Sequence, residues 1–478
     1  MFYLARTLKF LGYSVRMWTL NFKQSLSIAL ILSGLVLVWN AYESPNLFIS
    51  EKKSNEFSAS VSKDAFGENG LVSLSNYRPT FVSQISNMRL NTTLDSALPK
   101  DSCVQAYAQS GQKFRIDPIV NKQSGTAYAP ASTNKYITAA IALTVFNKND
   151  TLDTELFSES KNENVKRAYV KTSGDPSFVS VKTPSPRRPA YLSPENTRTF
   201  MDFAINISKS GVKNIDELVI DTKWFDLPQV ERGWEKDKLQ VGQISALNID
   251  EGFEGAELSE NPNLYAAQVL VNSMAQQGVS VGKIVESEIP AEVQKKENRI
   301  GLSSSPTIET IVSDMLKTSD NVYAEQILAV AVRTDNAKVD IDSRKNFVTE
   351  QLQDLGIELS GFVFENGSGY SKDARLSCEQ ENQIIKKMKE KGVDLTNLAS
   401  IAGVDGTLEN RFTGFSNKLR AKTGTLDNVS ALSGKLEQRF VFTFIANSQF
   451  SLEQGHGLQE VVVGALDAYP YVEQPNFG

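Results

Sequence analysis

Apolar and polar positions alternate with periods that predict strands near both ends of the chain and helices between them. Residues 104–108 and 114–116 have the alternation of two strands in a hairpin. Residues 132–146 carry apolar side chains at helical spacing, and a helical pattern extends from residue 307 to about residue 332. Another helix is predicted after Ser377. The chain therefore mixes both kinds of element along its length.

The C-terminal part predicts three further strands followed by a last amphipathic segment. These segments are residues 419–422, 429–434, 440–445 and 452–466. A middle region has strand and helix signals of its own. We therefore predict an α/β (α+β) fold in which a domain of residues 71–150 and 300–478 is interrupted by an inserted domain, residues 151–299.

The N-terminus has the pattern of an export signal. Residues 1–24 contain four basic side chains and no acidic one, and an apolar run follows over residues 26–39. We predict a cytoplasmic basic N-terminus, a signal anchor at residues 25–42 and a polar tether at residues 43–70. The expected location is the cell membrane, with a single span and an extracytoplasmic catalytic domain. A cleaved signal peptide is the alternative, giving a secreted or periplasmic protein, although Trp39 stands where cleavage prefers a small residue.

Composition and charge exclude several function classes. The net charge is −6, with no basic stripe beyond the N-terminus, which argues against binding to nucleic acid. His456 is the only histidine among 478 residues, and its glycine-flanked segment is interpreted as a surface turn. A Ser-His-Asp triad or a histidine-rich metal site would depend on that one residue, so we predict neither, and no cofactor.

A Ser-x-x-Lys motif begins the helical pattern at residue 132. Ser132 and Lys135 are three residues apart at a helix start, so their side chains share one face, and the amine lies beside the hydroxyl. The helix N-terminus also offers free backbone N–H groups to a developing oxyanion. The same spacing occurs elsewhere in the chain, and an N-capping serine with a solvated lysine would explain it equally well.

Two further motifs follow in order along the chain. Ser319 and Asn321 belong to a Ser-Asp-Asn sequence between two predicted helices, where a helix cap would be the simpler interpretation. Lys422, Thr423 and Gly424 form a Lys-Thr-Gly sequence at the end of a predicted strand. Ser-x-x-Lys, Ser-Asp-Asn and Lys-Thr-Gly together are the signature of penicillin-binding proteins and class A β-lactamases. Their order and local contexts favour a shared active site.

With these motifs the chain resembles the penicillin-binding protein 4, or peptidase S13, group of D-alanyl-D-alanine carboxypeptidases/endopeptidases, which are DacB-like. Residues 174–176, 366–369, 403–408 and 421–434 also match that family. The resemblance implies a penicillin-binding transpeptidase/β-lactamase-like domain, an antiparallel sheet flanked by helices and interrupted by an insertion. It departs from the family at Tyr370, where leucine is more usual.

The resemblance implies a serine peptidase that cleaves peptidoglycan stem peptides and is acylated by β-lactam antibiotics. Ser132 would attack the bond between two D-alanines, and Lys135 would take its proton. Ser319 would relay a proton to the leaving amine, and Asn321 would hold the substrate amide. The terminal carboxylate and the oxyanion would be bound by the strand-edge residues, which are Lys422, Thr423, Gly424 and Thr425.

Two other functions remain open at this point. A serine β-lactamase shares the first steps but needs fast deacylation, and the Glu-x-x-Leu-Asn setting used by class A enzymes is absent between the first and second motifs. A non-catalytic wall-binding or sensor module could keep the fold, although all the motif side chains are present.

The two cysteines are expected to form a disulfide. Cys103 precedes the first predicted hairpin strand and Cys378 lies in the second half of the same domain. In an exported protein disulfides persist, and a shared sheet would bring the two halves together. A bond across so long a loop would stabilise the fold by at most about 5 kcal/mol in the chain-entropy model.

Overall fold

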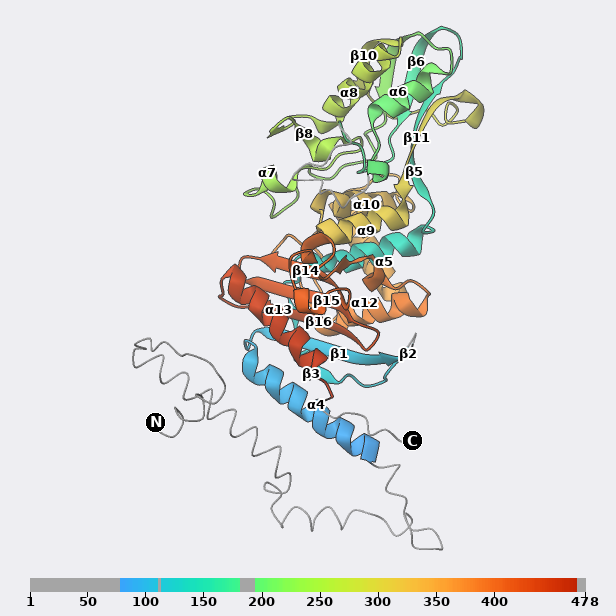
Figure 1. The fold of residues 1–478 in the computed structure, drawn as a ribbon. Helices are drawn as coiled ribbons and strands as arrows, with labels where there is room; N and C mark the ends of the chain where they lie inside the picture. Colours follow the sequence, from blue (N-terminus) through green and yellow to red (C-terminus); the bar gives the residue numbers. More distant parts are fainter. Residues whose placement is uncertain (1–77, 111–112, 181–193, 471–478) are drawn as a thin grey trace, which may run out of the picture. The chain divides into compact units, whose positions relative to one another are not determined.

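The computed structural model describes residues 78–110, 113–180 and 194–470, and each structural statement below refers to these residues. Apart from residues 78–80, the sheets, helices and site described here lie within the unit Phe81–Gly478. Figure 1 labels the elements along the chain.

The main sheet has seven antiparallel strands drawn from both ends of this unit. Its order is β13, β14, β15, β16, β1 and β2, with β3 also paired to β1. The bounds are Ser400–Ile401 (β13), Leu419–Leu426 (β14), Val429–Leu436 (β15), Phe440–Asn447 (β16), Ser102–Ser110 (β1), Lys113–Phe114 (β2) and Val120–Lys122 (β3). Pairing of β1 with β16 joins segments more than three hundred residues apart, with Cys103 opposite Ile445.

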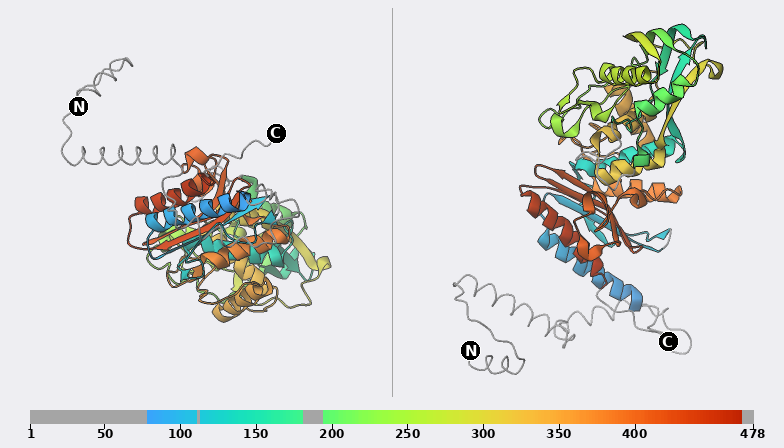
Figure 2. Two further views of the ribbon diagram at one scale, coloured as in Figure 1. Left: turned by 90° about the horizontal axis from the view of Figure 1, so that it is seen from below. Right: turned by 45° about the horizontal axis from the view of Figure 1, so that its top comes forward.

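Side-chain alternation along β1 gives the main sheet two covered faces. Val104 packs in one cluster with Leu94 of α4 (Arg78–Ala97) and Val463 of α13 (Leu452–Asp467). Cys103 faces the opposite side, where it packs with Cys378 at the start of α12 (Cys378–Glu390). Figure 2 shows α4 and α13 side by side over the sheet. The result is a sheet between two helical layers.

A group of helices lies beyond α12 and carries the Ser-x-x-Lys and Ser-Asp-Asn motifs (Figure 1). Its members are α5 (Lys135–Val145), α9 (Ile308–Thr318), α10 (Asn321–Arg333) and α11 (Ile341–Asp354). All eight residues of α5 from 135 to 142 are buried, which is typical of a helix surrounded by other elements. Helix α5 shares one apolar core with α9, α10 and α11.

A second, mixed sheet of five strands lies within residues 151–307. Its order is β10 (Ser280–Glu286), β7 (Asn214–Ile220), β6 (Asn164–Lys171), β5 (Thr151–Ser158) and β11 (Arg299–Thr307). Helices α6 (Phe200–Ser208) and α8 (Pro262–Gln276) pack on this sheet around a separate apolar core. A separate sheet with its own core agrees with the predicted inserted domain. The bounds of that domain, residues 151–299, remain a prediction.

The remaining strands and helices are short. They are β4 (Ala127–Tyr128), α7 (Lys238–Val241), β8 (Phe253–Glu254), β9 (Glu257–Leu258) and β12 (Leu376–Ser377), with β12 paired to β4 and β8 to β9. The pairing of β4 with β12 places the segment that precedes Ser132 next to the start of α12.

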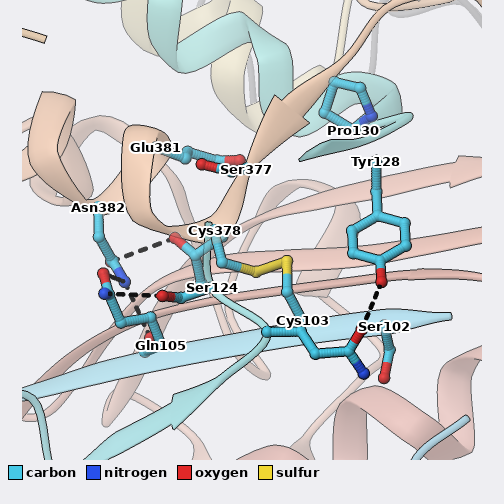
Figure 3. The surroundings of a disulfide bond; sticks show 12 residues. Ser102, Cys103, Gln105, Ser124, Tyr128, Pro130, Ser377, Cys378, Glu381 and Asn382 are labelled. Atoms are coloured by element: carbon cyan, nitrogen blue, oxygen red, sulfur yellow. Dashed lines mark hydrogen bonds between the residues drawn. A yellow bond between two sulfur atoms is a disulfide. The ribbon is translucent and has the colours of Figure 1, made fainter. Parts of the chain in front are cut away.

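The structure joins Cys103 to Cys378, the two residues that the sequence analysis expected to pair. Both side chains are fully buried between β1 and α12. Figure 3 shows the bond close to Tyr128 and Pro130, on the segment that leads to Ser132. The bond thereby attaches the start of α12 to β1 of the main sheet.

Two predictions about the chain are wrong. Among residues 78–110, 113–180 and 194–470, no helix is long and apolar enough to cross a bilayer. The single-pass membrane location and the membrane as a partner are therefore withdrawn, and the anchor assigned to residues 25–42 lies outside the described residues. The physical reason is length, since residues 26–39 would extend only about 21 Å as a helix, against about 30 Å of hydrocarbon.

The interpretation of the His456 segment as a surface turn is also wrong. His456 lies in the first turns of α13, which Ser451 begins with a capping box that includes Gln454. Gly455 lets this helix approach the sheet, because a β-carbon there would lie 3.3 Å from that of Ser430. The helix forms despite its glycines because its apolar face packs on the main sheet.

Candidate active site

Ser132 lies in a tight turn that precedes α5. The turn is a 3₁₀ helix, Ala131–Asn134, and Lys135 is the first residue of α5. Ala131 adopts a left-handed conformation with φ of 50°, between Pro130 and Ser132. The Lys135 amine lies 3.1 Å from the Ser132 hydroxyl oxygen, as the spacing of the motif predicted.

The amine of Lys135 has two further partners, and both are oxygen acceptors. It donates to Oδ1 of Asn321 at 2.7 Å and to the backbone carbonyl of Ser368 at 2.9 Å. Lys135 is fully buried. The structure thus brings the first two motifs together around one buried amine, and it adds a carbonyl from a loop that no motif included.

The Ser-Asp-Asn motif connects α9 to α10. Ser319 ends α9 in the left-handed region with φ of 64°, and the side chain of Asp320 caps α10 by accepting from the N–H of Tyr323 at 2.9 Å. Asn321 is then the first residue of α10 and faces Lys135. The abrupt change of direction at Ser319 sends its hydroxyl toward the third motif.

The Lys-Thr-Gly motif lies in the middle of β14, which continues to Leu426. The Lys422 amine donates to the Ser319 hydroxyl at 2.8 Å and to the carbonyl of Thr423 at 2.8 Å. The hydroxyl of Thr423 donates to the hydroxyl of Thr407 at 2.9 Å, whereas Thr425 is exposed. The three motifs therefore meet at the Ser-Asp-Asn turn, where Asn321 contacts Lys135 and Ser319 contacts Lys422. Assignment of all eight residues, Ser132 to Thr425, to one active site stays a prediction.

Two glycines allow β14 and the loop at residues 366–369 to pack against the Ser132 turn. A β-carbon on Gly424 would lie 2.7 Å from the carbonyl oxygen of Pro130. Gly369 has φ of 73°, and a β-carbon there would lie 2.1 Å from the carbonyl oxygen of Ala131. Neither space accommodates a side chain. Glycine at both positions therefore sets how closely β14 and the loop approach the Ser132 turn.

Burial dominates the electrostatics of the two lysines. It lowers the pKa of Lys135 to about 7, against the opposing effect of the Glu325 and Asp320 carboxylates. Burial also holds the pKa of Lys422 well below its usual range, and the charge of Lys135 lowers it further while Glu381 raises it. An amine that is neutral near pH 7 is available to accept a proton.

A cavity of about 1050 Å³ begins beside Thr425. It extends between the loops after Ser371 and after β14 and reaches His456. The hydroxyl of Tyr370, the residue at which the chain departs from the family pattern, donates to Oδ2 of Asp237 at 2.8 Å in the cavity lining. Charged residues of both signs line it, among them Arg232, Glu235, Lys236, Asp237, Lys372, Asp373 and Asp427.

Sequence reasoning missed several residues that complete the site. Ser368 supplies a carbonyl to Lys135, Thr407 holds Thr423, and the buried carboxylate of Glu381 accepts from the hydroxyl of Thr133 at 3.0 Å. Residues 366–369 and 403–408 were noted only as matches to a family. Both runs contain a glycine with positive φ, Gly369 and Gly406. Glycine in such a run is the sequence feature that could have indicated a tight turn at the site.

A protein-family model described as the D-Ala-D-Ala carboxypeptidase 3 (S13) family matches residues 90–261 and 256–468. The chain belongs to this family. The match includes every motif residue of the site. The predicted family and the enzyme class, a serine-type D-Ala-D-Ala carboxypeptidase, are therefore confirmed.

Named relatives of this S13-family enzyme include mycobacterial carboxypeptidases. Carboxypeptidase Rv3627c of Mycobacterium tuberculosis is 28% identical over 345 residues, covering 66% of this chain and 71% of that protein. Carboxypeptidase DacB of Mycolicibacterium smegmatis is 24% identical over 348 residues, covering 67% of this chain and 71% of its own.

A solved structure supports the fold class. Penicillin binding protein 4 of Haemophilus influenzae superposes with a TM-score of 0.63 at 18% identity, covering 79% of this chain and 98% of that one. The predicted class, an antiparallel sheet flanked by helices, is confirmed. Within the described ranges of the chain, no cluster of three or more His, Cys, Asp or Glu side chains could hold a metal ion.

Proposed function

We propose that this S13-family enzyme cleaves the D-Ala–D-Ala bond of peptidoglycan stem peptides with Ser132 as nucleophile and Lys135 as general base. One observation carries the assignment. A neutral amine has two N–H groups and one lone pair, and two of the three partners of Lys135 are oxygens that accept. If Asn321 and Ser368 take both N–H groups, the lone pair is directed at the hydroxyl of Ser132, 3.1 Å away.

The first chemical step forms an ester on Ser132. The Ser132 oxygen attacks the carbonyl carbon between the two D-alanines, and its proton passes to Lys135. The backbone N–H groups of Ser132 and Thr425 would bind the oxyanion, each contributing roughly 3 to 4 kcal/mol in comparable hydrolases. Gly424, which precedes Thr425, packs against Pro130 and Ala131, which precede Ser132, and this packing supports the role.

The leaving group needs a proton as its C–N bond breaks. Ser319 can transfer one and regain it from the protonated Lys422 amine, which donates to the Ser319 hydroxyl at 2.8 Å. The side chain of Asn321 keeps its amide N–H groups for the substrate while its oxygen accepts from Lys135. D-Alanine then leaves as a neutral amine, and water hydrolyses the ester to regenerate Ser132.

The strand edge is suited to the terminal carboxylate of the substrate. Lys422 supplies the charge, since an approaching carboxylate favours its protonated form. Thr425 offers an exposed hydroxyl, while Thr423 is directed by its bond to Thr407. The cavity beside Thr425 would receive the stem peptide. β-Lactams carry a carboxylate next to a strained amide and would acylate Ser132 by the same path.

Two measurements test this function. A fluorescent penicillin should label the purified protein covalently, and the label should be absent from Ser132→Ala. Digestion of purified muropeptides, followed by mass spectrometry, should show loss of one alanine for carboxypeptidase activity or separation of cross-linked dimers for endopeptidase activity. A wild-type protein that neither takes the label nor alters muropeptides would contradict the proposal.

A further inference from the structure

Glu325 holds the loop that supplies a carbonyl to Lys135. Its carboxylate, fully buried on α10, accepts from the backbone N–H of Gly367 at 2.9 Å and from that of Ser368 at 2.7 Å. A carboxylate that bridges two successive N–H groups fixes the peptide plane between them. The carbonyl of Ser368 is attached to this clamped segment, and it accepts from the Lys135 amine.

The opposite side of the same loop is bound to the helix that carries Lys135. The side-chain amide of Asn134 donates to the carbonyls of Asn366 at 3.0 Å and Gly367 at 3.3 Å, and the Thr138 hydroxyl donates to Gly367 at 2.8 Å. The loop therefore lies between two sets of partners. Glu325 takes the N–H groups of Gly367 and Ser368, while Asn134 and α5 take the carbonyls.

Glu325 follows Asn321 by four residues on α10, so both side chains project from one face of that helix. One helix thus places two groups around the amine of Lys135. Asn321 contacts it directly, and Glu325 acts through the carbonyl of Ser368.

We propose that Glu325 is a positioning residue for the general base, holding the Gly367–Ser368 backbone so that the Ser368 carbonyl and Asn321 take both N–H groups of Lys135. In this arrangement the lone pair of the amine is directed at Ser132. The inference rests on the proposed role of Lys135 as base. It concerns a residue that belongs to none of the three motifs.

A buried ion pair keeps the Glu325 carboxylate in place. Arg344 of α11 donates to Glu325 at 3.0 Å and to both oxygens of Glu231, at 2.6 and 3.1 Å. Arg344 and Glu231 are themselves buried, so the guanidinium compensates two carboxylates in a region without solvent. Glu231 adjoins Arg232 in the cavity lining, and the Arg232 carbonyl accepts from Asn366.

The charges around Lys135 provide a measurement that distinguishes a positioning role of Glu325 from a merely structural one. Glu325 and Asp320 raise the pKa of Lys135 against the effect of burial. The buried amine of Lys422 faces Lys135 from β14, and its own pKa is held well below the usual range. Arg344 and Glu231 face Glu325 from the other side. Removing the Glu325 charge should therefore lower the pKa of Lys135, and the rate should rise with pH at a lower pH than in the wild type.

The experiment compares acylation rates by a fluorescent penicillin from pH 5 to 9 in the full-length wild type, Glu325→Gln, Glu325→Asp and Glu350→Gln. Glutamine cannot accept from both N–H groups, so we expect the acylation rate on the high-pH plateau to fall about tenfold or more. Glutamine also carries no charge, so the rising limb of the pH–rate profile should lie at a lower pH than in the wild type. Aspartate keeps the charge but is one methylene shorter, so we expect a similar fall with the limb near its wild-type pH. Glu350 is exposed on α11 and is the matched control.

Each outcome decides the proposal. A wild-type acylation rate in both Glu325 variants would overturn it. A lower rate in Glu325→Gln whose rising limb stays at the wild-type pH would also overturn it, because a merely structural role does not move the limb. If Glu325→Gln fails to fold by circular dichroism, Glu325→Asp decides, and a wild-type rate there refutes positioning. Failure of the wild type itself to be labelled would instead contradict the proposed function.

Discussion

A single added methyl group at Gly424 should separate β14 from the Ser132 turn. Gly424 has no left-handed φ, so alanine is allowed by the backbone and the effect of Gly424→Ala is steric. The new β-carbon would lie 2.7 Å from the Pro130 carbonyl oxygen, 3.0 Å from the Ala431 β-carbon and 3.3 Å from the Ala131 β-carbon. All three are backbone or backbone-attached atoms, so no flexible side chain can move aside.

The magnitude follows from this geometry. Restoring an ordinary contact of about 3.5 Å needs a displacement of more than about half an ångström between the strand and the turn. Overpacking of this kind costs roughly 1 to 3 kcal/mol of stability. Misplacement of reacting groups by about 1 Å costs about 100-fold in rate, so we expect acylation of Ser132 to slow by roughly 10- to 100-fold.

The assay measures the second-order rate of labelling by a fluorescent penicillin, together with the thermal unfolding midpoint. Gly457→Ala is the matched control, because Gly457 lies in α13 with no atom within 4 Å of its added methyl group. That variant should label normally and gain about 0.5 to 1 kcal/mol. Wild-type labelling and an unchanged midpoint in Gly424→Ala would refute the idea that this contact sets the position of Ser132.

Further predictions concern the site and the disulfide. Ser132→Ala should lose all covalent penicillin labelling yet melt within a few degrees of the wild type, and residual labelling would reassign the nucleophile. Because Lys135 must be neutral to act as base and its pKa is about 7, the acylation rate should rise as pH passes through about 7 and then level off; a flat profile would exclude this role. Replacing Cys103 and Cys378 with alanine opens a loop across 275 residues and should cost at most about 5 kcal/mol in urea unfolding. No change in unfolding would show that the bond contributes nothing to stability.

Local rules predicted the parts of the site that are close in sequence. The Ser132–Lys135 contact follows from two side chains three residues apart at a helix start, and the structure has it. Residues 429–434 and 440–445 were likewise predicted as strands, and the structure has them as β15 and β16, paired antiparallel.

The electrostatic state of Lys135 depended on the tertiary structure. Burial of α5 lowers its pKa to about 7, against the opposing carboxylates of Glu325 on α10 and of Asp320 at the N-cap of α10. Its partner at Ser368 is 233 residues away in the chain, and no periodicity records such a distance. The hydrogen bond of Glu325 to Ser368 and the packing of Gly424 against Pro130 likewise join segments that are far apart in the chain.

The sequence alone thus determined which side chains could react, because motif spacing and strand or helix periodicity act over a few residues. Only the tertiary structure decided how Ser132, Ser319 and Lys422 meet, since α5, the end of α9 and β14 are brought together by burial of apolar surface. That burial also removes water from the two lysines and lowers the pKa of each. The chemistry of the site therefore depends on the packing of segments that the sequence keeps far apart.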